Sequence, residues 1–180
     1  MAYQRTEEQR RHDLANAKSF ENYVAEEIGV PVHTRFTSKE MLDLWHPGYM
    51  VEIKEKNQSY GNRWHLLEGT EERDLFILDE LTVRKALKWF PEVFFLIRDN
   101  VGGNPDPRLF FIPIWEVISV PKSRVDREHH LGALKGKWII DLSMFTRITD
   151  VNEIPELAHH MLVEQVWKRP QCLGGLVGQV

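Results

Sequence analysis

Two strand-like segments joined by a turn are the feature that most restricts how this chain can fold. Residues 42–45 (LDLW) and 50–54 (MVEIK) flank a connection that contains His46, Pro47 and Gly48. Pro and Gly favour turns, whereas Val, Ile and Trp favour strands. The sequence therefore predicts a β-hairpin, because two runs of strand formers flank one short connection.

The register of this hairpin decides which side chains share a face. If Trp45 pairs with Met50, then Asp43 lies opposite Glu52, because side chains alternate between the two faces with a period of two. The same pairing places an apolar set on the other face: Leu42, Leu44, Val51 and Ile53. A shift of one residue would separate the two acids.

The acidic face of the predicted hairpin favours a metal site. Two carboxylates directly opposite each other on a sheet repel, and a bound cation would remove that repulsion. Carboxylate oxygens suit Mg²⁺ or Mn²⁺. Lys54 follows Glu52 by two residues, so we expect it on the same face as Asp43 and Glu52, within reach of anything bound to the metal. The alternative is that Glu52 and Lys54 form a solvated strand face and Asp43 is a polar edge residue.

Length and composition predict one soluble domain. The chain has 180 residues, of which 42% are hydrophobic and 28% are charged, as is usual for a globular protein with one core. The net charge of −4 argues against a uniformly basic surface but is compatible with a local basic cleft. A single cysteine, Cys172, excludes a disulfide framework and a cysteine-based zinc site.

The same survey gives expectations on location and domain limits. No segment has the apolar length of a membrane span or the apolar core of a signal peptide, so we expect a cytoplasmic protein with no membrane partner. We find no linker or repeat that would divide the chain. Residues 1–180 are therefore expected to form a single domain, in which 151–180 add a C-terminal helix and a Gly-rich tail.

A helix is predicted before the hairpin. Residues 6–28 carry apolar side chains at helical spacing, and Gly29 follows as a stop. Thr6 and Gln9 fit a capping box at the start. Glu21 lies beside the apolar stripe, where a Glu is more often simply exposed than functional.

The rest of the chain alternates short strands and helices. Strands are predicted at four places: 32–36, 93–97, 109–112 and 138–142. Helices are predicted over 79–90 and 154–167, and the first of them has four candidate core residues: Leu81, Ala86, Leu87 and Phe90. Two segments fit either a strand or a helical turn: 71–78 and 115–120. Residues 55–63 and 100–107 favour loops, and no element is assigned to the charged segment 121–137.

This order of elements, together with Asp43 and the tripeptide Glu52-Ile53-Lys54, resembles the PD-(D/E)XK nuclease superfamily. Over residues 10–120 the closest likeness is to the small resolvase-like and RecB-like endonucleases. In that family a core of helix, three strands, helix and strand carries an Asp on its second strand and an acid-X-Lys motif on its third. The resemblance implies an α/β fold with a mixed central β-sheet flanked by helices and a restriction-endonuclease-like α-β-β-β-α-β core.

The resemblance also implies a catalytic site. Asp43 and Glu52 would bind the divalent metal, with the backbone carbonyl of Ile53 as a further ligand. Lys54 would position or activate water, and Glu21 would join the site from the first helix, as in many members of the family.

Two departures from the family pattern concern the first acid. Asp43 follows Leu42 rather than a Pro, and only eight residues separate it from Glu52, which forces a tight hairpin. Glu40 competes with Asp43 for the position of the first acid.

The implied function is a metal-dependent DNA endonuclease that hydrolyses phosphodiester bonds, with branched DNA as one candidate substrate and a homodimer as a candidate assembly. Residues just after the motif are expected to hold the nucleic acid: Lys56, Gln58, Tyr60 and Arg63. The alternative is a non-catalytic module on a nuclease-like fold that binds nucleic acid or protein.

Overall fold

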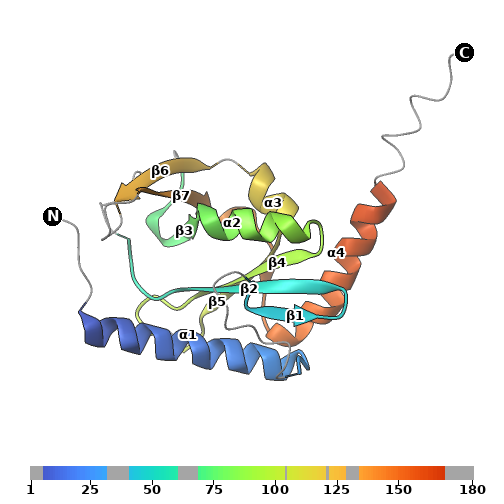
Figure 1. The fold of residues 1–180 in the computed structure, drawn as a ribbon, viewed down its shortest axis with the longest axis horizontal. Coiled ribbons are helices and arrows are strands. Elements are labelled where there is room, and N and C mark those ends of the chain that lie inside the picture. Colours follow the sequence, from blue (N-terminus) through green and yellow to red (C-terminus); the bar gives the residue numbers. More distant parts are fainter. Residues whose placement is uncertain are drawn as a thin grey trace, which may run out of the picture.

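The computed structural model describes residues 6–31, 41–60, 69–103, 105–120, 122–128 and 134–168, which form two β-sheets with helices packed around them (Figure 1). The larger sheet has the strand order β1 (Leu44–His46), β2 (Tyr49–Lys56), β4 (Val93–Asp99), β5 (Arg108–Pro113) and β8 (Arg147–Ile148). The smaller sheet has the order β3 (Leu75–Asp79), β7 (Leu134–Asp141) and β6 (Ser123–Glu128).

Four α-helices lie in the described part of the chain: α1 (Glu7–Glu27), α2 (Glu80–Ala86), α3 (Ile114–Ser119) and α4 (Ile154–Lys168). Four short 3₁₀ helices connect elements: η3 (Glu72–Asp74), η4 (Leu87–Trp89), η5 (Leu142–Met144) and η6 (Val151–Glu153). The larger sheet is mixed, because β2 and β4 are parallel and its other neighbours are antiparallel. The expected α/β class with a mixed sheet flanked by helices is confirmed.

The larger sheet separates two apolar clusters. On one face, α1 and α4 pack their buried residues, such as Val24 and Ile154, against Phe94. On the other face, α2, α3 and the smaller sheet cover Phe95 (Figure 1). Every residue from Val93 to Ile97 in β4 is fully buried, so the prediction of a strand buried on both faces is confirmed.

The hairpin has the predicted register. Leu44 pairs with Val51 and Trp45 with Met50, and Gly48 in the turn has a φ of 97°, which L-amino acids rarely adopt. One part of the prediction is wrong: Leu42 packs in the cluster of Met50 on the opposite face from Leu44 and Val51. The reason is that β1 begins only at Leu44, so the alternation of a strand does not extend back to Leu42.

A long connection returns the chain from β2 to β4. It passes through η3, adds β3 to the smaller sheet and continues into α2 before β4 pairs in parallel with β2. Parallel neighbours need a crossover of this kind, because a short turn can join only antiparallel strands. The crossover places α2 and the smaller sheet on the face of β2 that carries Glu52 and Lys54.

Most of the predicted helices are confirmed, with one error in a predicted face. Thr6 and Gln9 form the expected capping box of α1, and Asp79 caps α2. Within the predicted helix 79–90, however, Leu81, Leu87 and Phe90 are exposed, whereas Val83 and Ala86 are buried. The α-helix ends at Ala86 and continues as a 3₁₀ turn, so the helical spacing used for the prediction is not maintained.

The segment 121–137, to which no element was assigned, contains β6 and the start of β7. Its alternating charged residues, such as Arg124 and Asp126, suit a strand at the edge of a sheet. Of the two ambiguous segments, 71–78 contains η3 and most of β3, and 115–120 lies mainly in α3. The predicted loop 55–63 begins too early, because its first residues belong to β2, which continues to Lys56.

Some predictions fall outside the described residues: the strand at 32–36, Glu40, Arg63 and the tail beyond residue 168. Among the helices that the structure describes, none is long and apolar enough to cross a membrane.

Candidate metal centre

The hairpin brings Asp43 next to the acid-X-Lys tripeptide of β2. Asp43 directly precedes β1, and its Oδ2 accepts a hydrogen bond from the backbone N–H of Ile53 at 2.7 Å. Glu52 and Lys54 lie on the face of β2 opposite to Ile53, because side chains alternate along a strand. The backbone of β2 therefore holds the Asp43 carboxylate beside Glu52 and Lys54.

The ammonium group of Lys54 lies among the predicted ligand oxygens. Its Nζ donates to Glu52 Oε1 at 2.5 Å and to the carbonyl oxygen of Ile53 at 3.1 Å. The same Nζ lies 3.9 Å from Asp43 Oδ2. One cation thus lies 3.9 Å or less from an oxygen of each of the three residues predicted to bind the metal.

Burial and charge act in opposite directions on this group. Glu52 is 6% exposed, and burial raises the pKa of its carboxyl, with the positive charge of Lys54 acting against the rise. Burial alone would lower the pKa of Lys54, but the charges of Glu52 and Asp43 raise it above its usual range. Each partner therefore favours the charged form of the other: Lys54 acts against the rise in the pKa of Glu52, and the acids raise the pKa of Lys54.

Glu21 belongs to the same electrostatic group. It is half-buried on α1, and its pKa is raised, first by burial and then by the negative charge of Asp43. The charges of Lys54 and Glu52 also act on it. Among the described residues, no three His, Cys, Asp or Glu side chains are grouped closely enough to hold a metal ion. The candidate centre therefore consists of two carboxylates and one carbonyl, with Glu21 as an additional nearby negative charge.

The predicted nucleic-acid-binding residues lie in different environments. Lys56 is 2% exposed, and its Nζ donates to the carbonyl oxygens of Glu72 at 3.2 Å and Arg73 at 2.8 Å. Its ammonium therefore anchors η3 to β2 rather than facing solvent. Gln58 is exposed, and Tyr60 is half-buried.

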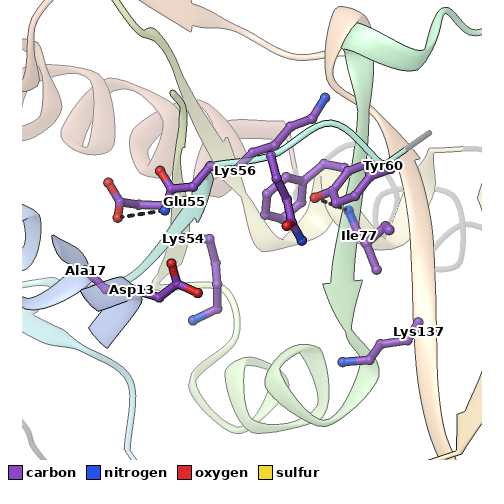
Figure 2. A pocket seen from close by; sticks show the side chains of 11 residues that line it. Asp13, Ala17, Lys54, Glu55, Lys56, Tyr60, Ile77 and Lys137 are labelled. Carbon is purple, nitrogen blue, oxygen red and sulfur yellow. Dashed lines mark hydrogen bonds between the residues drawn. The ribbon is translucent and has the colours of Figure 1, made fainter. Parts of the chain in front are cut away.

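A cavity of about 450 Å³ adjoins the centre on the side of Lys54 (Figure 2). Gln58 and Tyr60 line it, together with Asp13 from α1 and Lys137 from β7. Neither Asp13 nor Lys137 was predicted to belong to the site, because neither residue has a local sequence signal that relates it to the hairpin. Only the packing of α1 and of the smaller sheet brings them to this place.

Asp43 and Glu52 offer carboxylate oxygens, the kind of donor that hard divalent cations prefer, beside the positive side chain of Lys54. Comparison with models of known protein families, with curated proteins and with solved structures finds no match to this chain. The chemistry of these side chains is therefore the main indication of function.

Proposed function

We propose that this protein is a Mg²⁺- or Mn²⁺-dependent DNA endonuclease with a restriction-endonuclease-like core. The observation that carries the proposal is the convergence of oxygens from Asp43, Glu52 and Ile53 on the single cation of Lys54. The chain order supports it too, because α1 precedes an acidic hairpin that is followed by α2 and by a strand parallel to β2.

The residues of the centre fit a divalent metal. Two carboxylates and a carbonyl are hard oxygen donors of the kind that Mg²⁺ and Mn²⁺ prefer. Asp43, Glu52 and the carbonyl of Ile53 would hold the ion. When bound, it would supply positive charge for the phosphate oxygens and lower the pKa of a coordinated water.

Lys54 has a role that the acids cannot supply. Its ammonium is a compact charge on a flexible stem, so it can leave Glu52 and turn toward a phosphate group. There it would stabilise the negative charge that develops on the phosphate as the water attacks, or orient that water. Glu21 keeps an acid beside Asp43 and so favours a cation in the centre.

The test compares cleavage by the wild type with that by Asp43→Asn, Glu52→Gln and Lys54→Ala. The substrates are a labelled four-way junction, a linear duplex and a single strand, each with Mn²⁺ and with EDTA. We expect cleavage by the wild type with Mn²⁺ only, and a loss of about 100-fold or more in each variant. Glu92→Gln and Lys88→Ala remove exposed charges elsewhere and should cleave normally. Normal cleavage by Lys54→Ala would contradict the proposed role of Lys54.

The non-catalytic alternative is favoured by one observation. Lys54 already neutralises part of the acidic charge in the absence of a metal, so the group could be a self-sufficient ion pair. A protein that binds the same DNA substrates in Mn²⁺ but cleaves none of them would support this alternative against the nuclease.

A further inference from the structure

We propose that the cavity beside Lys54 holds one nucleotide of an unpaired DNA strand, and that Lys137 binds its phosphate. This inference rests on the proposed nuclease function and adds a substrate class to it. The expected substrate is a DNA strand that is single-stranded next to the bond that is cut.

Lys54 belongs both to the wall of the cavity and to the candidate metal centre. Lys54 lines the cavity and also contacts Glu52, so a ligand in the cavity lies within reach of the side chain that borders the acids. The segment that follows β2 forms another part of the wall. The remaining walls come from more distant parts of the chain, namely α1 and strands β3 and β7 of the smaller sheet (Figure 2). The smaller sheet thus forms one wall of a space that Lys54 also lines.

Lys137 places a second cation on the wall formed by the smaller sheet. Its Nζ donates to Asp79 Oδ2 at 2.8 Å, and its side chain remains 25% exposed. Asp79 is itself fixed, because its Oδ1 accepts from the N–H of Leu81 and so caps α2. An ammonium has three donors, so Lys137 can keep this contact and also donate to a phosphate oxygen.

The aromatic ring of Tyr60 lines the same cavity. The hydroxyl of Tyr60 accepts a hydrogen bond from the backbone N–H of Ile77 at 3.4 Å, and Lys56 Nζ lies 5.1 Å from the ring centroid. These contacts connect the ring to both sheets. Cations combined with an aromatic side chain in one groove are the arrangement by which proteins bind unpaired strands without sequence preference.

The size of the cavity favours a single nucleotide unit over a duplex. Its volume of about 450 Å³ falls within the range of roughly 300–1,000 Å³ that is usual for small-molecule pockets. In a duplex the bases are stacked and paired inside the helix, so a base can enter such a pocket only after it has left the stack. An unpaired strand avoids this cost.

The test measures binding of fluorescently labelled oligothymidine and of a duplex of equal length, by polarisation in EDTA so that nothing is cleaved. We expect the wild type to prefer the single strand, and Lys137→Met and Tyr60→Leu each to weaken single-strand binding about tenfold. Tyr60→Phe keeps the ring and should bind like the wild type. Lys88→Met removes an exposed lysine away from the cavity and should also bind normally.

The outcomes separate this inference from the proposed function. Equal binding of both DNA forms, or unchanged single-strand binding by Lys137→Met, overturns the inference while leaving a nuclease that acts on duplex DNA. Failure of the wild type to bind or cleave any of the DNA forms overturns both. Thermal unfolding of each variant identifies any loss of binding that results from misfolding, and a folded Lys137→Met variant decides the question if Tyr60→Leu is unstable.

Discussion

Arg108 and Lys54 each bring two carboxylates to one cation, but they do so with different geometry. Arg108, from β5, donates to Asp74 Oδ1 at 2.5 Å and to Asp99 Oδ2 at 2.5 Å, and its third contact is the carbonyl of Arg73 at 2.7 Å. These partners lie in η3 and β4, so one guanidinium connects the larger sheet to the segment that leads into the smaller sheet. Its planar set of donors fits several acceptors at once.

Lys54 carries its charge on one ammonium nitrogen, whereas Arg108 has a planar guanidinium with several donors. It has a close contact with Glu52, while Asp43 Oδ2 is 3.9 Å away, and the side chain adjoins a cavity. Moving Lys54 therefore breaks few contacts, so in the proposed function a divalent cation takes its place beside the acids. We therefore expect the acid pair closed by Arg108 to be a structural clamp, whereas the pair closed by Lys54 is the one we propose to accept a different cation.

The largest expected effect comes from breaking the arginine cluster. Arg108→Met should lower the free energy of unfolding by about 3 kcal/mol, because Asp74 and Asp99 would remain buried without their cation. Asp99 is already poorly satisfied, since its buried Oδ1 has no hydrogen-bond partner among the described residues. Urea unfolding measures the change, with the exposed Arg84→Met as the matched control. A loss below about 1 kcal/mol, or recovery of stability on addition of Mn²⁺, would remove the distinction between the two clusters.

A smaller effect is expected at Lys54, and it is a gain in metal affinity instead of a loss of stability. Lys54→Met should bind Mn²⁺ about tenfold more tightly than the wild type, a change of about 1.4 kcal/mol, because no ammonium competes for the oxygens of Glu52 and Ile53. Isothermal titration calorimetry measures the affinity, and Lys54→Arg, which keeps a competing cation, should show no such gain. Weaker binding by Lys54→Met would mean that Lys54 supports the metal rather than standing in for it.

The smallest effect concerns the pair of Asp79 and Lys137, in which both side chains are partly exposed. Burial raises the pKa of Asp79, but the hydrogen bond and the charge of Lys137, the hydrogen bond from the N–H of Leu81 and the charge of Lys135 together outweigh burial, so the folded-state pKa lies below the ordinary value of 3.8. The stability that this pair contributes is therefore present above pH 3.8 and is lost as the pH falls through the folded-state pKa.

Asp79→Asn removes the charge and keeps a residue that caps helices well. We expect it to lower the free energy of unfolding by about 0.5 kcal/mol at pH 7, and the difference from the wild type should vanish below the folded-state pKa of Asp79. Urea unfolding at a series of pH values down to pH 3 measures the difference. A difference that persists unchanged in acid would show that the charge of Asp79 is not its source.

Local sequence patterns were sufficient to predict the hairpin but insufficient to predict the charged strand β6. The assumed pairing of Trp45 with Met50, one of the few registers that a short turn allows, is confirmed. Strand β6 was missed because its charged residues, such as Arg124 and Asp126, have the composition of a loop. Its strand conformation depends on pairing with β7, which composition does not report.

The sequence by itself placed Asp43, Glu52 and Lys54 in one hairpin. Closing its short loop costs little entropy, and the period of two along β2 puts Glu52 and Lys54 on the same face. Only the tertiary structure decided what surrounds them. The packing of α1 brings Glu21 toward Asp43, η3 takes the ammonium of Lys56 out of solvent, and the smaller sheet carries Lys137 to the cavity. These contacts join segments far apart in the chain, and they form because separate apolar faces must be buried together.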